Sequence, residues 1–329
     1  MVKKFVLQWH LSENCNLKCL HCYQENHKPI QLDFDKLVII YKQFKELLNK
    51  KKMKGHINIT GGEPLCNSYL FKLLDLIKED SDLISFSILT NGALINEKIA
   101  KKIKSYNPLY VQVSLEGGKK TNDYIRGKGT YKKIAEGIVN LRKENIFTSI
   151  SFTATSLNYK EFPKVVRYAR RYDVNNVWSD RFIPLGDSDK SLALNYGQTR
   201  EYLEIMNKER NKLKKIKNNN TTISMYRALQ FQMTNDFAYG CTAGDTLLTV
   251  MENGDLVPCR RMPIAIGNLF NRTMYDLYMK SGILKKLREK KIPDECMDCE
   301  HSEVCHGGLK CLTYAMYKDL NHKDYGCNL

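Results

Sequence analysis

The sequence carries three closely spaced cysteines near its start, in the segment Cys15-Asn-Leu-Lys-Cys19-Leu-His-Cys22. This segment follows the first predicted strand, Phe5–Leu11, so it lies on a loop at the strand's C-terminal end, where the active sites of α/β proteins form. Three thiolates on a cube of four irons leave one iron open to another ligand, whereas four thiolates make an electron carrier. The spacing therefore predicts an iron–sulfur cluster with an open iron. A zinc site is the alternative, although zinc-binding cysteines are more often spaced as CxxC.

Strand-like and helix-like segments alternate from this region to about residue 184. The predicted strands are Phe5–Leu11, His56–Thr60, Ile84–Thr90, Tyr110–Leu115, Thr148–Ala154 and Val177–Ile183. The predicted helices, with apolar residues spaced three and four apart, lie near Phe34–Lys52, Tyr69–Glu79, Glu97–Tyr106, Tyr131–Asn145 and Lys160–Tyr172. This alternation predicts an α/β fold with a parallel sheet and right-handed crossovers. The pattern alone does not separate an open sheet from an incomplete barrel.

A second group of cysteines lies in the last third of the chain. It holds seven of the eleven cysteines: Cys241, Cys259, Cys296, Cys299, Cys305, Cys311 and Cys327. Cysteines this dense bind metal or form disulfides. The N-terminus has no apolar signal-peptide core and no apolar run is long enough to span a membrane, so we expect a cytoplasmic protein with no membrane partner. Because that compartment keeps thiols reduced, metal ligation is the better prediction, with two structural zinc sites as the alternative to iron–sulfur clusters.

The composition changes along the chain in a way that predicts two domains. We expect a core at residues 1–185, a connection at 186–237 and a cysteine-rich domain at 238–329. The connection comprises a polar linker, Gly186–Asn195, and a charged bridging helix, Gln198–Lys217. In the last domain, Asn253-Gly254 predicts the turn of a hairpin. The net charge of +16 favours an acidic partner, such as nucleic acid, an acidic peptide or an acidic small molecule. Lysine-rich composition along the whole chain explains the charge equally well.

Further motifs follow the predicted strands in a recognisable order. The second strand ends in Thr60-Gly61-Gly62-Glu63-Pro64, and the fourth in Val113-Ser114-Leu115-Glu116-Gly117, followed by Tyr124-Ile-Arg126-Gly. With the CxxxCxxC triplet, these motifs resemble the radical S-adenosylmethionine (SAM) superfamily over essentially the whole chain. The resemblance implies a partial (β/α)6 barrel and a core [4Fe–4S] cluster. In that family SAM is reductively cleaved, giving a 5′-deoxyadenosyl radical that abstracts hydrogen from a substrate.

The resemblance also implies which residues bind the cofactors. The core cluster ligands would be Cys15, Cys19 and Cys22. The residues implied to contact SAM are Tyr23, Gly61, Gly62, Glu63, Pro64, Asn91, Ser114 and Arg126. Glu63 would offer a carboxylate to the ammonium group of SAM, Ser114 would meet the ribose, and the planar fork of Arg126 would suit the carboxylate. Asn91 is as readily interpreted as a residue of a turn that begins a helix. Many relatives have Asp at the position of Glu116.

The cysteine-rich third resembles the SPASM domain, which carries auxiliary clusters in radical SAM enzymes that modify peptides and proteins. It implies two auxiliary [4Fe–4S] clusters. Cys241, Cys259 and Cys311 would hold the first, and Cys296, Cys299, Cys305 and Cys327 the second. The first set lacks a fourth cysteine, whose place a substrate group or a side chain such as Asp236 would take. The segment Cys305-His-Gly-Gly-Leu-Lys-Cys311 departs from the family, which commonly has three residues between these cysteines rather than five.

These resemblances imply an oxidoreductase-type enzyme that matures ribosomally synthesised peptides by cross-linking, thioether formation, splicing or epimerisation. Cys66, just beyond the Gly-Gly-Glu-Pro motif, could donate a hydrogen atom to a substrate radical, although a lone cysteine is more often a small buried apolar residue. The partners implied are a precursor peptide and an electron donor such as flavodoxin or ferredoxin. Because the first strand begins almost at the N-terminus, we also expect a separate leader-binding protein.

Three other functions remain open on the sequence. Sulfatase maturation uses the same architecture, but those enzymes usually have an eighth auxiliary-domain cysteine, and the nearest upstream cysteine here is Cys66. Synthesis of a small-molecule or haem-type cofactor would cleave SAM without a peptide. A protein of another class would be a non-catalytic zinc or iron–sulfur module that binds nucleic acid. The residues predicted to form a SAM pocket argue against that module, which has no use for one.

Overall fold

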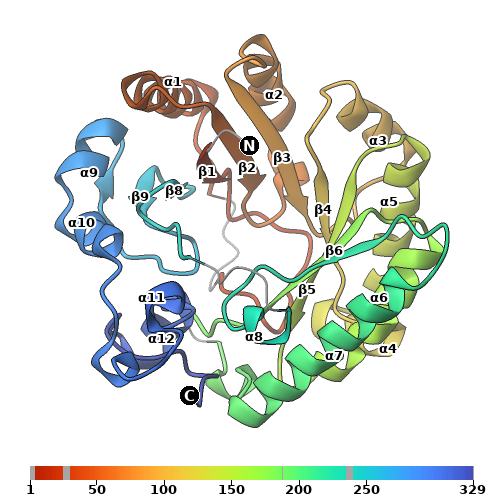
Figure 1. Ribbon diagram of the computed structural model, residues 1–329. Coiled ribbons are helices and arrows are strands. Elements are labelled where there is room, and N and C mark those ends of the chain that lie inside the picture. The colour runs from red at the N-terminus through yellow and green to blue at the C-terminus, as the bar shows by residue number, and fades with distance from the viewer. Residues whose placement is uncertain (1–3, 25–29, 187, 235–239, 329) are drawn as a thin grey trace.

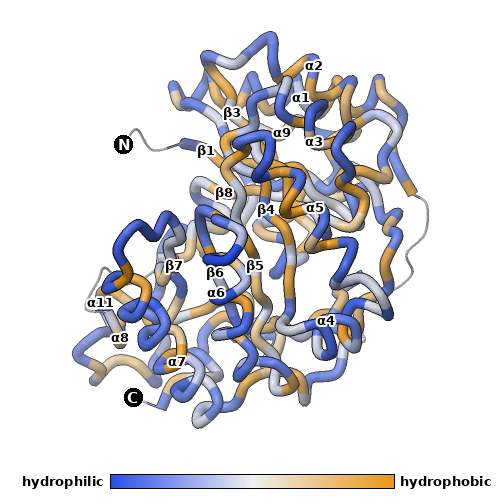
Figure 2. Tube along the Cα trace, turned by 90° about the vertical axis from the view of Figure 1, so that its right-hand side faces the viewer, coloured by the Kyte–Doolittle hydropathy of each residue, from blue (hydrophilic) through white to orange (hydrophobic). Residues whose placement is uncertain are grey.

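The computed structural model describes residues 4–24, 30–186, 188–234 and 240–328. Within these ranges, one ten-stranded sheet forms the centre of the molecule (Figure 1), with the strand order β10-β9-β8-β1-β2-β3-β4-β5-β6-β7. Because β10 and β7 lie at opposite edges, the sheet does not close into a complete ring. Figure 2 shows hydrophobic residues concentrated along the central strands and hydrophilic stretches at the periphery.

The predicted parallel sheet is confirmed. Its strands are β1 (Phe5–His10), β2 (Gly55–Thr60), β3 (Ile84–Thr90), β4 (Val111–Ser114), β5 (Thr148–Ala154), β6 (Asn176–Arg181) and a short β7 (Thr222–Ser224). Each pairs with its neighbour in parallel, so all their carboxyl ends meet at one rim. Loops that leave this rim therefore converge, which brings together the motifs predicted at the strand ends.

Helices line the outside of the curved sheet (Figure 1). They are α1 (Phe34–Lys51), α2 (Leu70–Glu79), α3 (Glu97–Lys104), α4 (Lys119–Arg126), α5 (Thr130–Lys143), α6 (Phe162–Arg171) and α7 (Tyr196–Lys214). Side-chain caps begin several of them: Asp33 accepts from Lys36 N, and Asn195 forms a capping box with Gln198. The predicted helices are confirmed, whereas α4 was not predicted as a helix. Short 3₁₀ turns occur at η1 (Pro64–Cys66), η2 (Tyr159–Glu161), η3 (Lys190–Leu192) and η4 (Asp294–Cys296).

The cysteine-rich region continues the same sheet. Strand β8 (Leu247–Val250) pairs in parallel with β1, followed by β9 (Asp255–Val257) and β10 (Gly267–Asn268). The predicted hairpin is β8–β9, and its turn needs the left-handed backbone of Gly254, at φ 87°. The helices here are α8 (Phe231–Thr234), α9 (Met274–Lys280), α10 (Gly282–Glu289), α11 (Ser302–Cys305) and α12 (Lys310–Tyr317). Since one sheet runs through both regions, the domain limits drawn from the sequence stay a prediction.

The segment predicted as a polar linker packs more closely than expected. Leu192 and Leu194 are buried, and Leu192 packs in a small cluster with Phe182. Their apolar side chains therefore tie the connection to the core, which corrects the expectation of a purely polar linker. None of the described helices combines the length and the apolar character that crossing a membrane would require.

Candidate active site

A cavity of about 250 Å³ lies at the carboxyl rim of the sheet and collects most of the predicted site residues. Those that line it are Cys15, Cys19, Cys22, Tyr23, Gly61, Gly62, Asn91, Ser114 and Arg126. Glu63, Pro64 and Cys66 are not among its lining residues. The convergence of parallel strand ends thus brings together the cysteine triplet and the polar groups predicted to contact SAM.

Two glycines let the β2 loop press against the cysteine loop. A Cβ on Gly61 would lie 2.6 Å from Ser12 O, and one on Gly62 would lie 2.4 Å from Asn14 O. The same approach forms backbone hydrogen bonds, from Gly62 N to Ser12 O (2.7 Å) and from Glu63 N to Asn14 O (2.8 Å). Larger residues would push the two loops apart, so the glycines set the position of the triplet against the sheet.

The Glu63 carboxylate forms hydrogen bonds within the protein and does not line the cavity. Its side chain is fully buried, and it accepts hydrogen bonds from Thr90 Oγ1 (2.7 Å), Asn91 N (2.7 Å) and Leu65 N (3.1 Å). Burial raises the pKa of Glu63 despite these donors. The carboxylate therefore fastens the β2 loop to the end of β3, and the parts of the motif that face the cavity are Gly61 and Gly62.

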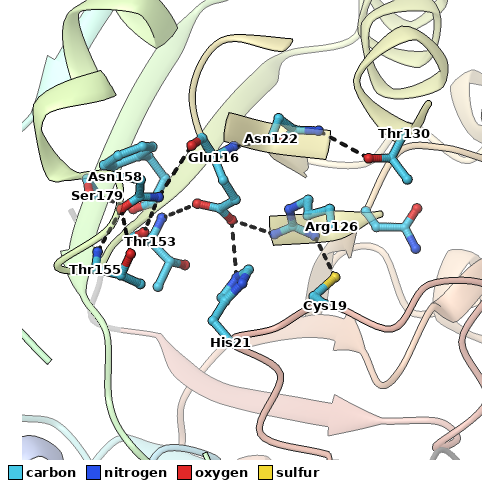
Figure 3. Close-up of polar contacts among 12 residues, drawn as sticks. Cys19, His21, Glu116, Asn122, Arg126, Thr130, Thr153, Thr155, Asn158 and Ser179 are labelled. Atoms are coloured by element: carbon cyan, nitrogen blue, oxygen red, sulfur yellow. Dashed lines mark hydrogen bonds and ion pairs between the residues drawn. The ribbon is translucent and has the colours of Figure 1, made fainter. Parts of the chain in front are cut away.

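A buried ion pair holds Arg126 beside the cysteine triplet (Figure 3). Arg126 Nη2 lies 2.5 Å from Glu116 Oε1, and Nη1 donates to Cys19 Sγ at 3.7 Å. The second Glu116 oxygen accepts from Thr153 N at 2.9 Å, and His21 Nε2 lies 3.4 Å from the first. Burial alone would raise the pKa of Glu116, but the charge of Arg126 and the contact with His21 hold it at about 2. Sequence reasoning left Glu116 without a role, which the structure supplies as the partner of Arg126.

The three thiols suit an iron–sulfur cluster. Cys15 Sγ accepts from Leu17 N at 3.4 Å and from Asn91 Nδ2 at 3.8 Å, and Cys22 Sγ accepts from Gln24 N at 3.4 Å. With the Arg126 contact, each sulfur has a donor, and hydrogen bonds to the sulfurs are a recognised means of tuning such clusters. All three thiols also line one cavity, so a cluster on them would present its open iron to the remaining lining groups. The residues present therefore fit the predicted cluster.

The C-terminal cysteines gather in the two sets that the resemblance implied. The first set, Cys241, Cys259 and Cys311, lines a second cavity of about 470 Å³. The second set lines a small pocket and consists of Cys296, Cys299, Cys305 and Cys327. Across the described ranges, no group of three His, Cys, Asp or Glu side chains is arranged to hold a single metal ion. Asp236, suggested as an extra ligand, lies outside the described residues.

The unusual spacing before Cys311 has a structural reason. Helix α11 ends at Cys305, and His306, Gly307 and Gly308 follow with positive φ angles of 50°, 77° and 76°. This left-handed turn leads to α12, whose first turn carries Cys311. The additional residues therefore separate the two cysteines, so that Cys305 joins the second set and Cys311 the first.

The cavity of the triplet and the cavity of the first auxiliary set share a wall. Five residues line each of them: Gln8, Leu89, Gln112, Trp178 and Arg261. Trp178 Nε1 donates to Gln112 Oε1 at 2.6 Å, which joins a side chain of β6 to one of β4 across β5. The site of the first auxiliary set and the site of the triplet are therefore adjacent cavities.

Cys66 lies apart from both cavities. Its thiol accepts a hydrogen bond from the backbone of Asn16, and burial followed by the nearby Glu63 raises its pKa. It lines neither the cavity of the triplet nor that of the first auxiliary set. The role of hydrogen donor remains a prediction from the sequence, without support from this placement.

Comparison with known proteins identifies two domains. The protein-family model described as "Radical SAM superfamily" matches residues 9–169. A second family model, described as "Iron-sulfur cluster-binding domain", matches residues 241–300. The protein MJ0907 of Methanocaldococcus jannaschii is 31% identical over 81% of this chain and 89% of its own length.

Two further relatives cover nearly the whole chain. Fe-coproporphyrin III synthase of Methanosarcina barkeri is 24% identical over 99% of this chain and 88% of its own. Mycofactocin maturase MftC of Mycolicibacterium smegmatis is 25% identical over 98% and 82%. Among solved structures, Streptococcus suis SuiB bound to its precursor peptide SuiA superposes with a TM-score of 0.78 at 18% identity, covering 100% of this chain and 77% of SuiB.

Proposed function

Since the chain belongs to the radical SAM superfamily and carries a SPASM iron–sulfur domain, we propose that this enzyme modifies a ribosomally synthesised peptide. Among its relatives is a maturase, MftC, and a structure with the same fold was solved with a precursor peptide. When bound, the core cluster and SAM supply reductive cleavage of SAM and the abstraction of a hydrogen atom from the substrate.

The shared wall between the two cavities is the observation that carries this proposal. A substrate in the larger cavity would extend from the first auxiliary set toward the cysteine triplet. Amide side chains such as Gln8, Asn58 and Gln112 line that cavity, and amides offer both donors and acceptors to a peptide backbone. At about 470 Å³ the cavity has the size of an ordinary ligand site.

In this proposal, residues of the chain position the three clusters and SAM. The triplet holds the core cluster, and the C-terminal sets hold two auxiliary clusters. The backbone of Gly61 and Gly62 faces the ammonium group of SAM, because the Glu63 carboxylate is already bonded within the protein. Ser114 and Arg126 face the ribose and the carboxylate of SAM.

The triplet provides the first test. The variant C15A/C19A/C22A should produce no 5′-deoxyadenosine when it is incubated anaerobically with SAM and a reductant. Normal production by this variant would contradict the assignment of the core cluster.

The peptide substrate needs a separate experiment. A short peptide encoded beside this gene is incubated with the reconstituted enzyme, SAM and a reductant in H₂O and in D₂O, and its mass is recorded. Loss of two hydrogens indicates cross-linking, and gain of one deuteron only in D₂O indicates epimerisation. An unchanged peptide with accumulating 5′-deoxyadenosine would move the substrate to another peptide, a protein or a small molecule.

A second candidate function is the synthesis of a haem-type cofactor. It is favoured by one observation, the likeness to Fe-coproporphyrin III synthase over nearly the full length of both chains. Conversion of an iron porphyrin by the holoenzyme, followed by absorbance and mass, would distinguish this function from peptide modification.

A further inference from the structure

The cavity of the cysteine triplet is lined by arginines and, within the part of the chain that the structure describes, by no carboxylate side chain. Its lining includes Arg126, Arg181, Arg260 and Arg261 but no aspartate or glutamate among the described residues. The adjoining cavity is likewise lined by Arg227 and Arg261 and by no described acidic side chain. Such a cavity favours an anionic occupant, because a charge of one sign in low-dielectric surroundings attracts the opposite sign.

Three of the four arginines of the triplet cavity have a carboxylate partner behind its wall, and Arg261 shares its partner with Arg227. Arg126 pairs with buried Glu116. Arg181 makes a bidentate pair with buried Asp324, at 2.6 and 2.7 Å. Arg261 donates to buried Asp180, which also accepts from Arg227 Nε at 2.7 Å. Each of these guanidinium groups therefore has a carboxylate partner within the protein.

Arg260 is different. The residue is 8% exposed, and its Nε has no hydrogen-bond partner in the described structure. Its guanidinium carbon lies 4.1 Å from the ring centroid of Tyr23, and Nη2 makes one long hydrogen bond, 3.4 Å, to Tyr23 O. The charge of Arg260 acts to lower the pKa of Glu252, although burial raises that pKa more strongly. No ion pair within the described residues joins the two side chains.

No carboxylate of the described residues forms a direct ion pair with Arg260. His10 is fully buried beside it, with neither ring nitrogen hydrogen-bonded, and burial followed by the charge of Arg260 lowers the pKa of His10 so that the ring is neutral. A buried guanidinium without a carboxylate is costly unless a ligand supplies the missing partner. Arg260 thus combines near-complete burial, an unpartnered Nε and a position in the wall of the triplet cavity.

We propose that Arg260, which lines the triplet cavity next in sequence to the shared Arg261, binds a carboxylate of the substrate. This inference rests on the proposed function, because the main source of the carboxylate would be the peptide substrate. The carboxylate would belong to an aspartate, a glutamate or the C-terminus of that peptide. A porphyrin carboxylate is the other source of the same chemistry. In either case a bidentate contact with the planar guanidinium would hold the substrate between the first auxiliary set and the triplet.

The test measures binding to the reconstituted holoenzyme under anaerobic conditions with SAM present. One probe is a pool of end-blocked synthetic heptapeptides, each with a single Asp or Glu, compared with the matched pool carrying Asn or Gln. A third pool has a free C-terminal carboxylate as its only acid, and Fe-coproporphyrin III forms a separate arm. Retained peptides are identified by mass after ultrafiltration, and porphyrin binding is followed by absorbance.

The variants are Arg260→Gln, which removes the charge, and Arg260→Lys, which keeps the charge but loses the fork. Arg200→Gln is the matched control, since the Arg200 side chain is 64% exposed and pairs with Glu204 on the surface of α7. SAM affinity and the absorbance of the clusters are measured for every variant, because SAM also carries a carboxylate and because a misfolded variant would lose its clusters.

Wild-type enzyme should retain carboxylate-bearing probes in preference to their amide counterparts. R260Q should weaken that binding by about tenfold to a hundredfold, R260K should restore part of it, and R200Q should leave it unchanged. Retention of acidic peptides supports the proposal together with peptide modification. Arg260-dependent binding of the porphyrin alone supports the carboxylate site but contradicts the peptide function.

Other outcomes overturn the inference while leaving the proposed function intact. These are equal retention of acid and amide probes, retention that is unchanged in R260Q with intact clusters, or no carboxylate-dependent binding of any probe. A loss of SAM affinity in R260Q with unchanged probe binding would assign Arg260 to the cofactor instead.

Discussion

At the residue scale, Asp324 joins the C-terminal segment to the core. Both of its oxygens bond to Arg181 at the end of β6, and they also accept from Leu309 N (2.8 Å) and Gly326 N (2.9 Å). The Arg181 and Asp324 side chains are 3% and 1% exposed. Removing one partner of a buried pair leaves an uncompensated charge, which costs far more than losing an exposed pair.

We therefore predict that Asp324→Asn lowers the free energy of unfolding by about 3–5 kcal/mol. Urea-induced loss of far-ultraviolet circular dichroism would measure it. The control is Glu204→Gln, which breaks the exposed pair with Arg200 and should cost less than about 1 kcal/mol. The double variant R181M/D324L, in which neither charge of this pair remains, should recover part of the loss. Equal effects of D324N and E204Q would contradict a structural role for the pair.

Glu116 has a similar place beside the candidate catalytic cysteines. In Glu116→Gln the neutral amide no longer balances Arg126, whose other nitrogen donates to Cys19 Sγ. We expect 5′-deoxyadenosine formation to fall by at least about tenfold, the value of one charge-assisted hydrogen bond. Chromatography of the nucleoside would measure the rate, and Glu201→Gln, at an exposed pair with Lys160, is the control. An unchanged rate in E116Q with intact clusters would show that Arg126 does not depend on this carboxylate.

These ion pairs explain what the sequence could not predict at this scale. Ser114 and Arg126 could be predicted because both lie in short sequence motifs at or after the end of the fourth strand. The partnership of Arg181 with Asp324 joins residues 143 positions apart, and no local pattern links them. The sequence also does not show that Arg260 has no ion-pair partner among the described residues, because this depends on the positions of all the surrounding carboxylates.

At the element scale, the β2 loop and the cysteine loop fit together through a glycine. In Gly62→Ala the new Cβ would lie 2.4 Å from Asn14 O and 2.5 Å from Glu13 O, both backbone atoms that cannot turn away. We predict that G62A fails to assemble the core cluster and loses roughly four irons per chain. Iron content and electron paramagnetic resonance of the reduced protein would measure the loss.

The matched control is Gly282→Ala at the start of α10, where an added Cβ would meet nothing within 4 Å. It should keep the full iron content. If G62A also kept it, the close approach of the two loops would not be needed to hold the cluster.

Elements of the core were predictable because periodic burial fixes them. Strands β1 to β6 carry continuous or alternating apolar residues, and α1 buries one face, including Leu37, Phe44 and Leu48. Helices α11 and α12 could not be predicted in this way. They are four and eight residues long, and left-handed residues between them direct Cys305 and Cys311 to different sets. These helices are too short to show a hydrophobic repeat, although Leu309, Leu312 and Ala315 pack in a buried apolar cluster.

At the scale of the whole molecule, the cysteine-rich region completes the sheet of the core. Strand β1 lies between β2 and β8, and Leu248 and Val250 of β8 are fully buried in the same cluster of apolar residues as Leu7 and Trp9. The sequence suggested two domains because the cysteine content changes sharply near residue 238. Composition does not reveal strand pairing, so it could not show that β1 bonds to a strand about 240 residues later, as in Val6 with Leu247.

This continuity predicts that a fragment of residues 1–237 will not behave as an independent core. Without β8, one edge of β1 would expose unpaired backbone groups and the apolar face that Leu248 and Val250 cover. Such an edge is prone to aggregation. We therefore expect the fragment to aggregate or to lack a cooperative urea transition, as measured by light scattering and circular dichroism. The control is the full-length variant C296A/C299A/C305A/C327A, which loses the second auxiliary set but keeps β8 to β10, and it should remain monodisperse. A monomeric fragment with cooperative unfolding would show instead that the boundary near residue 238 separates two autonomous domains, because the pairing of β1 with β8 would then be dispensable for the core.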